Sequence, residues 1–138
     1  MPEPSPEEVP LQGLAADFAT RVARRDTADP PPPPSQTPEA IAARVDAWLR
    51  AQHRVRDPRA RYALTRMLLL LVRQPEASTA ALQAAAGLGP RSGARSTLRL
   101  GALGLTEWFY RARTRCHRLT RAGEDALLPV VTGAAGAI

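Results

Sequence analysis

The hydrophobic period of the carboxy-terminal half of the chain changes at Gly104-Leu105. Before this dipeptide, apolar residues recur every three or four positions, which predicts helices. After it, the stretch "LTEWFYRARTRCHRLT" (105–120) carries strand-type residues on both sides of a polar middle, which predicts a β-hairpin with its tip at 111–114. This tip sets a register of three cross-strand pairs: Tyr110 with Arg115, Trp108 with His117, and Thr106 with Leu119. The predicted fold class is therefore mainly α with a small β-hairpin.

Two helices upstream of this region begin at residues that suit a helix start. Thr37-Pro38 begins the first, which runs to about residue 57. Its large apolar residues fall on one face: Ile41, Val45, Trp48 and Leu49. Asp57-Pro58 begins the second, which runs to about Arg73 and is apolar nearly all round in its second half. This second helix is therefore predicted to lie at the centre of the core.

A short helix and a longer one follow, separated by a break that contains Gly87. Ser78 or Thr79 caps the short helix, and Gly87 offers a left-handed stop for it. Pro90 begins the longer helix, which Gly104-Leu105 ends. Three leucines of this helix are expected to face the core: Leu98, Leu100 and Leu103.

The two ends of the chain are predicted to be extensions of this domain. Prolines disfavour a helix in residues 1–10, and the apolar residues that follow at helical spacing predict a short amphipathic helix that ends near Arg25. Pro30 to Pro34 then form a polyproline II linker, for which the alternative is a docking motif for a protein partner. After the hairpin, Thr120 caps a helix that Pro129 is expected to end.

The predicted organisation has four parts. They are an acidic, Pro-rich extension (1–36), an amphipathic helix (37–57), a domain of helices and a hairpin (58–128), and a flexible tail (129–138).

Charge is distributed unevenly along the chain. Residues 1–57 carry a net charge of −2 and residues 58–138 a net charge of +8, and within 90–121 eight arginines accompany a single acid, Glu107. All nineteen basic residues are arginine, and both lysine and asparagine are absent, which is typical of a high-GC bacterial genome. The choice of arginine is therefore uninformative, but its placement indicates an anionic partner, which can be DNA, RNA or an anionic membrane.

Other classes of site receive little support from the sequence. Cys116, His53 and His117 do not have the spacing of metal ligands. There is no Gly-rich phosphate loop, no paired set of carboxylates and no Ser-His-Asp arrangement, so we expect neither an enzyme nor a cofactor site. The longest apolar run, Met67 to Val72, is too short to span a bilayer. The acidic, Pro-rich amino terminus is the reverse of a secretory signal, so a cytoplasmic protein is expected.

The order of the predicted elements resembles the winged helix-turn-helix domain of bacterial transcriptional regulators, most closely those of the MarR and PadR types. The stretches that carry the resemblance are "STAALQAAAGLGPRSGARSTLRLGALGL" (78–105) and "HRLTRAGEDAL" (117–127). They include two patterns of that family, Leu-x-x-x-Gly-Leu at 100–105 and R-L-T-x-x-G at 118–123. Two features depart from it: Gly93 stands where relatives usually have a core aliphatic residue, and the long carboxy-terminal dimer helix of MarR proteins is missing.

The resemblance implies double-stranded DNA as the partner, read by the helix from Pro90 and supported by the hairpin, or wing. A spacing of four places three arginines in one stripe on this helix, where their forks suit the O6 and N7 atoms of guanine. Hairpin arginines suit phosphates or a minor groove. The candidate contacts are Arg91, Ser92, Arg95, Ser96 and Arg99 on the helix, and Arg111, Arg113 and Arg115 on the hairpin. For both groups the alternative is a solvated, charged surface.

The remaining hairpin residues are assigned to packing. Trp108, Phe109 and Tyr110 are expected to pack in the hairpin and core rather than to stack on bases, and Cys116 and His117 are expected to be packing residues of the second strand.

The leading hypothesis is a sequence-specific DNA-binding protein, acting as a transcriptional repressor. The alternative is a non-enzymatic winged-helix subunit of a larger nucleic-acid-handling assembly, for plasmid replication, partition or CRISPR-type functions, without strong sequence readout. The apolar face of 37–57 is assigned to a homodimer interface, because helix-turn-helix dimers hold two reading helices ~34 Å apart. Its alternative is to fold back on its own domain.

Overall fold

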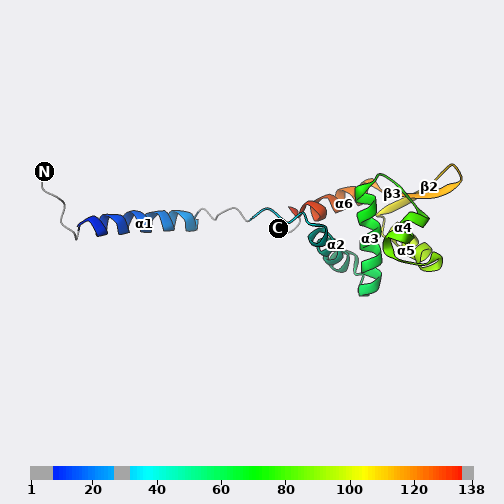
Figure 1. The fold of residues 1–138 in the computed structure, drawn as a ribbon, viewed down its shortest axis with the longest axis horizontal. Coiled ribbons are helices and arrows are strands. Elements are labelled where there is room, and N and C mark those ends of the chain that lie inside the picture. Colours follow the sequence, from blue (N-terminus) through cyan, green and yellow to red (C-terminus); the bar gives the residue numbers. More distant parts are fainter. Residues whose placement is uncertain (1–7, 27–31, 135–138) are drawn as a thin grey trace. The chain divides into compact units, whose positions relative to one another are not determined.

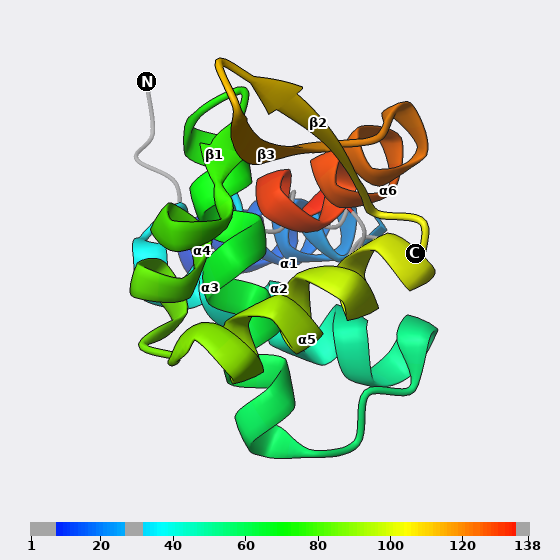
Figure 2. The ribbon, with the colours of Figure 1, turned by 90° about the vertical axis from the view of Figure 1, so that its right-hand side faces the viewer.

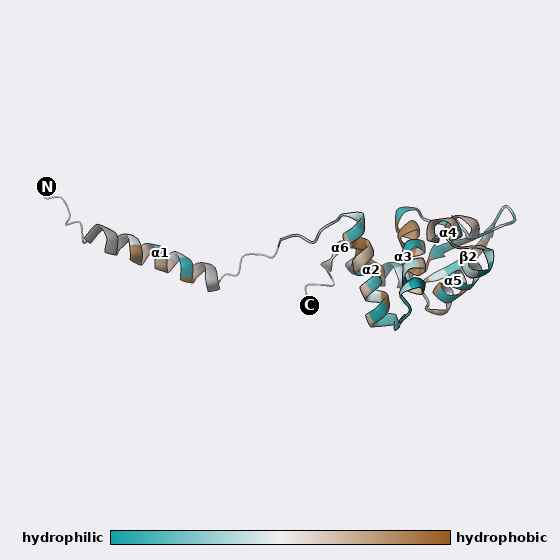
Figure 3. Ribbon diagram, turned by 60° about the horizontal axis from the view of Figure 1, so that its bottom comes forward, coloured by the Kyte–Doolittle hydropathy of each residue, from teal (hydrophilic) through white to brown (hydrophobic). Residues whose placement is uncertain are grey.

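The computed structural model describes residues 8–26 and 32–134, and the chain divides into two compact units, Met1–Pro33 and Pro34–Ile138. The first unit contains one helix, α1 (Glu8–Asp26), along which apolar residues recur between polar ones (Figure 3). The expected amphipathic helix is therefore confirmed, but it begins before Pro10. Proline is tolerated there because the N–H groups of a first helical turn have no intrahelical acceptor. Pro30 and Pro31 of the proline tract lie outside the described residues.

The second unit holds five helices and a three-stranded antiparallel sheet in the order β1-β3-β2 (Figure 1). Its elements are α2 (Pro38–His53), α3 (Pro58–Arg73), β1 (Ala77–Ser78), α4 (Thr79–Ala86), α5 (Pro90–Ala102), β2 (Thr106–Arg111), β3 (Thr114–Leu119) and α6 (Arg121–Thr132). Within this unit, α2 and α6 lie at one end, and α4, α5 and the β2–β3 hairpin lie at the other. The predicted fold class is confirmed.

Side-chain caps fix the starts of four helices where the sequence predicts them. Thr37, Asp57, Ser78 and Thr120 each accept a hydrogen bond from a backbone N–H of the first turn, at 2.9–3.3 Å. Gly87 ends α4 in the left-handed region, at φ +67°. Such caps satisfy backbone groups that have no partner inside the helix.

The core is built around α3, as its all-round apolar sequence predicts. Leu64, Met67 and Leu68 are almost completely inaccessible, and α2, α4 and α5 all pack on α3. Leu82 of α4 and Leu100 of α5 complete the same cluster. Burial of a leucine side chain stabilises the fold by about 1.5–3 kcal/mol, so this cluster fixes where α5 lies.

The apolar face of α2 is buried in its own unit, so its assignment to a homodimer interface is wrong. Val45 and Leu49 have no exposed surface, and Ile41 and Trp48 are half-buried against the same core. The face packs on α3 and α6. Residues 37–57 are therefore structurally part of the domain predicted for 58–128.

Two arginines join α2 to its neighbours. Arg44 donates from Nε to the carbonyl oxygen of Val130 (2.9 Å) and from a terminal nitrogen to that of Val131 (2.8 Å). Arg61 of α3 is buried, pairs with Asp46 at 3.0 Å, and also donates to two backbone carbonyls of the α2–α3 turn. Hydrogen bonds to charged groups are worth about 1.5–3 kcal/mol each, so α2 is held firmly in place.

Helix α6 passes through Pro129 and ends at Thr132, so the expectation that it stops at Pro129 is wrong. Val130 is buried in the core, and Gln36 and Arg44 donate to the last carbonyls of the helix. These contacts offset the backbone hydrogen bond that proline cannot make. Gly133 then ends the helix at φ +87°, so the part of the expected flexible tail up to residue 132 is helical; residues 135–138 lie outside the described residues.

The hairpin has the register expected from the sequence. Tyr110 pairs with Arg115, Trp108 with His117, and Thr106 with Leu119. Its tip is a two-residue turn of Ala112 and Arg113, both at positive φ (+48° and +68°). A third strand, β1, was not predicted from the sequence; its two residues, Ala77 and Ser78, pair with β3.

The two family-like patterns of the sequence meet at the base of the hairpin. Gly104 adopts φ +78° after α5, and its carbonyl oxygen accepts a hydrogen bond from the Thr120 hydroxyl at 2.7 Å. The Thr120 N–H donates to the Leu105 carbonyl at 3.0 Å. A Cβ on Gly123 would overlap that same carbonyl. Glycine at 123 therefore lets α6 approach the end of α5 closely.

Candidate nucleic-acid interface

Helix α5 turns its arginines outward. Arg91, Arg95 and Arg99 are exposed along the helix, with Ser92 exposed and Ser96 half-buried beside them. On the opposite face, Gly93, Thr97 and Leu100 are buried. The spacing of four therefore produces the expected stripe of arginines on the accessible side of the helix.

The departure at Gly93 has a structural reason. A Cβ at this position would overlap the side chain of Gln83 on α4. The Gln83 side chain occupies the space in which the expected aliphatic side chain would lie. Because Gly93 has no side chain, helices α4 and α5 can pack closely at this contact.

Leu98 does not face the core, contrary to the sequence prediction. Its exposed fraction is 76%, whereas Leu100 is buried and Leu103 is half-buried. Residues two apart on a helix point about 200° away from each other, so Leu98 and Leu100 cannot share a face. Leu98 lies three residues after Arg95, on the same side of the helix as the arginine stripe.

The acid inside the basic segment 90–121, Glu107, and the nearest acid before it, Glu76, both pair with hairpin arginines. Arg111 meets Glu76 in two contacts, at 2.6 and 2.9 Å, and these contacts raise the pKa of the Arg111 guanidinium. Arg118 meets Glu107 at 2.9 Å. In the described part of the chain, no acid pairs with the arginines of α5 or with Arg113. The α5 face therefore keeps its full positive charge.

The hairpin arginines differ from one another. Arg115 lies over the Trp108 ring at 4.1 Å from its centroid, and Tyr110 meets Trp108 edge-on at 5.5 Å. Arg113 is exposed in the turn. Trp108 and Tyr110 are 53% and 65% exposed, so they pack within the hairpin, as expected, but not in the core. Phe109 is half-buried on the other face, beneath Arg111 and Arg118.

Cys116 and His117 lie behind this surface as buried strand residues, as the sequence predicts. His117 Nε2 and the Thr79 hydroxyl are 2.8 Å apart, which joins β3 to the start of α4. Burial, together with the nearby charge of Arg115, lowers the pKa of His117. His53 packs edge-on against Trp48, and its pKa is lowered by burial. Among the described residues, no cluster of potential metal ligands occurs.

A shallow depression of about 670 Å³ separates α5 from the hairpin. Leu98 and Ala94 border it on the helix, and Trp108 and Arg115 border it on the hairpin. Figure 2 looks onto this side of the unit, where α5 crosses the face and the hairpin lies above it. Helix and hairpin thus form one basic surface with a hollow between them.

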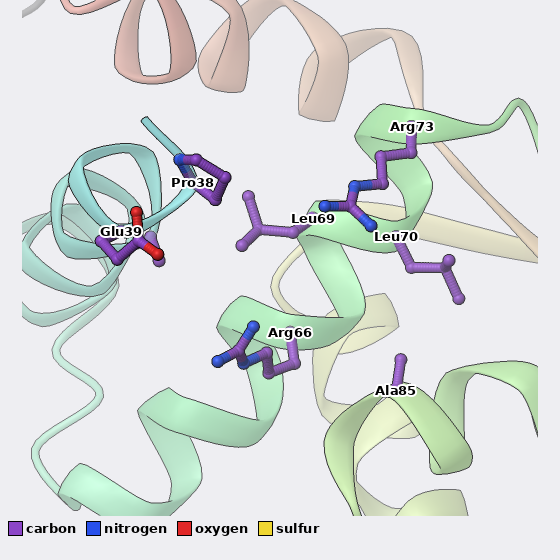
Figure 4. Close-up of a pocket in the computed structure, with 8 residues that line it drawn as sticks. Pro38, Glu39, Arg66, Leu69, Leu70, Arg73 and Ala85 are labelled. Carbon is purple, nitrogen blue, oxygen red and sulfur yellow. The ribbon is translucent and has the colours of Figure 1, made fainter. Parts of the chain in front are cut away.

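A second, smaller cleft of about 270 Å³ lies among α2, α3 and α4 (Figure 4). It is bordered by Arg66 and Arg73 from α3 and by Glu39 from α2. Neither α5 nor the hairpin contributes to its lining. No helix of the described residues is both long enough and apolar enough to cross a bilayer.

No family model and no curated protein matches the sequence. The structure is similar to that of a MarR family transcriptional regulator from Silicibacter pomeroyi DSS-3, with 24% identity and a TM-score of 0.52 over 71% of this chain and 67% of that one. It is also similar to RV1404 from Mycobacterium tuberculosis, with 20% identity and a TM-score of 0.52 over 99% of this chain and 79% of that one. The winged helix-turn-helix fold of MarR-type regulators, expected from the sequence, is confirmed.

Proposed function

We propose that this winged helix-turn-helix chain is a transcriptional regulator that binds double-stranded DNA. In this proposal α5 enters the major groove and the hairpin contacts the neighbouring backbone. The observation that carries it is the unneutralised arginine stripe of α5, since the acids nearest in sequence pair with the hairpin instead. A charged face that served only solubility would normally carry acidic residues as well as arginines.

The dimensions and chemistry of α5 suit a major groove. An α-helix with side chains is about 10–12 Å across, and the groove is about 12 Å wide. Small residues such as Ser92 and Ala94 lie between the arginines and allow a close approach to base edges. Arginine presents a fork that matches the O6 and N7 acceptors of guanine. We infer that Arg95, in the middle of the stripe, contacts a base.

The hairpin suits a supporting role at the backbone. Arg113 is exposed at the tip, where it is free to reach a phosphate or a minor groove. Arg115 is oriented by Trp108 toward the hollow between α5 and the hairpin. Contacts of this kind position a protein on DNA without reading sequence.

We infer that the regulator is a repressor that acts by occupying an operator. Occupancy requires only sequence-specific binding, and the winged unit contains the reading helix and the wing that such binding uses. The alternative, a subunit that holds DNA or RNA without reading sequence, uses the same basic surface. The two are separated by whether binding selects a consensus from a random pool of duplexes.

A salt titration of duplex binding tests the proposal. About six phosphate contacts give a slope near −5 for log K against log salt concentration. Arg50→Ala on α2 is the matched control, because it removes one exposed arginine at the opposite end of the unit from the hairpin. This control should leave the slope unchanged. A wild-type slope near zero contradicts nucleic-acid binding altogether.

A further inference from the structure

Leu98 is the most exposed of the large apolar side chains in the described parts of the chain, at 76%. A single exposed leucine is ordinary on a protein surface. This one lies on the arginine face of α5, three residues after Arg95 and seven after Arg91. Its position on the proposed DNA-binding face is what calls for an explanation.

The residues around Leu98 leave it standing above the helix surface. Its neighbours one turn away include Ala94, Gly101 and Ala102, all exposed and all small. The hairpin does not cover it, because the hollow of about 670 Å³ separates it from Trp108. Leu98 is therefore an isolated apolar projection on a floor of small residues, flanked by arginines.

We propose that Leu98 is a specificity-determining residue that contacts the C5-methyl group of a thymine in the major groove. This inference rests on the proposed function, because it requires α5 to enter that groove. The thymine methyl is the one apolar group on the major-groove edges of the base pairs, and aliphatic side chains discriminate thymine by touching it. A charged or polar contact is not open to leucine.

The spacing along α5 also predicts where this thymine lies. Three residues of helix rise about 4.5 Å, whereas successive base pairs of B-DNA rise about 3.4 Å. Arg95 and Leu98 therefore reach positions one or two base pairs apart. The preferred site is expected to hold a thymine, on either strand, within two base pairs of the guanine that Arg95 contacts.

Substitution of deoxyuridine for thymine tests the inference, because it deletes only the methyl group. The probe is a duplex selected from a random pool with the wild-type chain, in which each thymine is replaced in turn. One position is expected to weaken wild-type binding about fourfold, the equilibrium factor for burying one methyl-sized group. Leu98→Ala should bind the thymine and uracil duplexes equally.

The controls separate this inference from the function on which it rests. Leu128→Ala removes a leucine of similar exposure (65%) from α6 and should keep the wild-type ratio between thymine and uracil duplexes. Leu98→Met should keep most of the difference in affinity between the thymine and uracil duplexes. Salt-dependent binding with no uracil effect at any position overturns the role of Leu98 and leaves DNA binding intact. Failure to bind any duplex removes the proposed function itself.

Two further results also overturn the inference. Leu98→Ala can weaken thymine and uracil duplexes by the same factor, which means that Leu98 touches something other than the methyl group. The selected site can also lack a thymine within two base pairs of the Arg95-dependent guanine. Because Leu98 is exposed and alanine favours helix, loss of folding is not expected in the variant.

Discussion

Helix α5 and the hairpin carry similar numbers of arginines but use them differently. On α5 the arginines point into solvent without an acidic partner in the described residues, whereas on the hairpin Arg111 and Arg118 pair with Glu76 and Glu107. Arg115 is stacked on Trp108, which leaves Arg113 at the tip. Among the described residues, the α5 arginines thus have no acidic partner, whereas three of the hairpin arginines have an acidic or aromatic partner within the hairpin or beside it.

The acids, rather than the arginines, therefore decide which basic residues remain available for a partner. Glu76 precedes β1 and Glu107 lies on β2, and each is close enough in space to a hairpin arginine to neutralise it. Counting arginines in the sequence therefore overestimates the charge of the hairpin.

Arg95→Ala is expected to have the largest effect. Loss of a bidentate contact to guanine costs roughly 1–3 kcal/mol on the preferred duplex and relaxes the base preference at one position. Because a base contact neutralises no phosphate, the salt slope should change little. Fluorescence anisotropy with preferred and random duplexes measures both quantities. Equal loss on the two duplexes would show that α5 is a phosphate clamp, and the assembly-subunit alternative would gain support.

Arg113→Ala should weaken binding to all duplexes by nearly the same factor. The same anisotropy titrations, repeated over a range of salt, should give a slope shallower by about 0.9, the effect of losing one phosphate contact. Arg111→Ala is the matched comparison. It should change the salt slope less than Arg113→Ala does, because Arg111 already pairs with Glu76. If Arg113→Ala instead changed the base preference, the wing would be a reading element, and the contrast with α5 would break.

Glu76→Gln is expected to strengthen binding by releasing Arg111. The released guanidinium can reach one more phosphate, so the salt slope should become steeper by up to about 0.9. Glu39→Gln removes the same charge from α2, at the other end of the unit, and should leave the slope as it is. An unchanged slope in Glu76→Gln would mean that Arg111 braces the hairpin in a position from which DNA is out of reach.

The smallest effect concerns pH and the anchoring of the hairpin. Since burial lowers the pKa of His117, the folded chain binds this proton less readily than the unfolded chain, whose histidines titrate near about 6.5. The contribution of His117 to stability is full above that pH and declines as pH falls toward the lowered pKa. The melting temperature should therefore fall between pH 7.5 and 5.5.

His117→Gln should flatten this pH dependence. His53→Gln should flatten it less, because His53 is less buried although its pKa is lowered in the same direction. The readout is the slope of the melting temperature with pH, so a uniform loss of stability in either variant does not affect it. An undiminished slope in His117→Gln would place the titrating group elsewhere.

Local signals made most of the fold predictable from the sequence. Caps at Thr37, Asp57, Ser78 and Thr120 fix helix starts through groups only two or three residues away, and the hairpin register follows from alternation about a polar tip. The exposed positions of the α5 arginines likewise follow from helical spacing. In each case the determining interaction is close in sequence.

The errors arose where distant residues decide the outcome. An amphipathic face has the same pattern whether it packs on its own domain or on a second copy, so the burial of Val45 and Leu49 could not be read from α2 alone. The pair of Glu76 and Arg111 joins residues 35 apart in sequence. Strand β1 has two residues, too few to show a period.

Leu98 was missed for a different reason. The sequence prediction placed Leu98 in the core because leucine is apolar, although its spacing of two from Leu100 excludes a common helix face. Strict use of the angle would have found it. An apolar residue whose helical angle places it among exposed basic residues therefore indicates a candidate contact with the partner of that face.

The hydrogen bonds of Gln36 and Arg44 have a topological consequence. Gln36 and Ser35, at the start of the second unit, are linked through side chains to Val130, Val131 and Thr132 at its end. The two points where the backbone enters and leaves this unit therefore lie next to each other. Units with adjacent ends tolerate circular permutation and insertion into a loop of another protein. The residues from Pro34 to Gly133 therefore meet the geometric condition for insertion into a loop of a host chain.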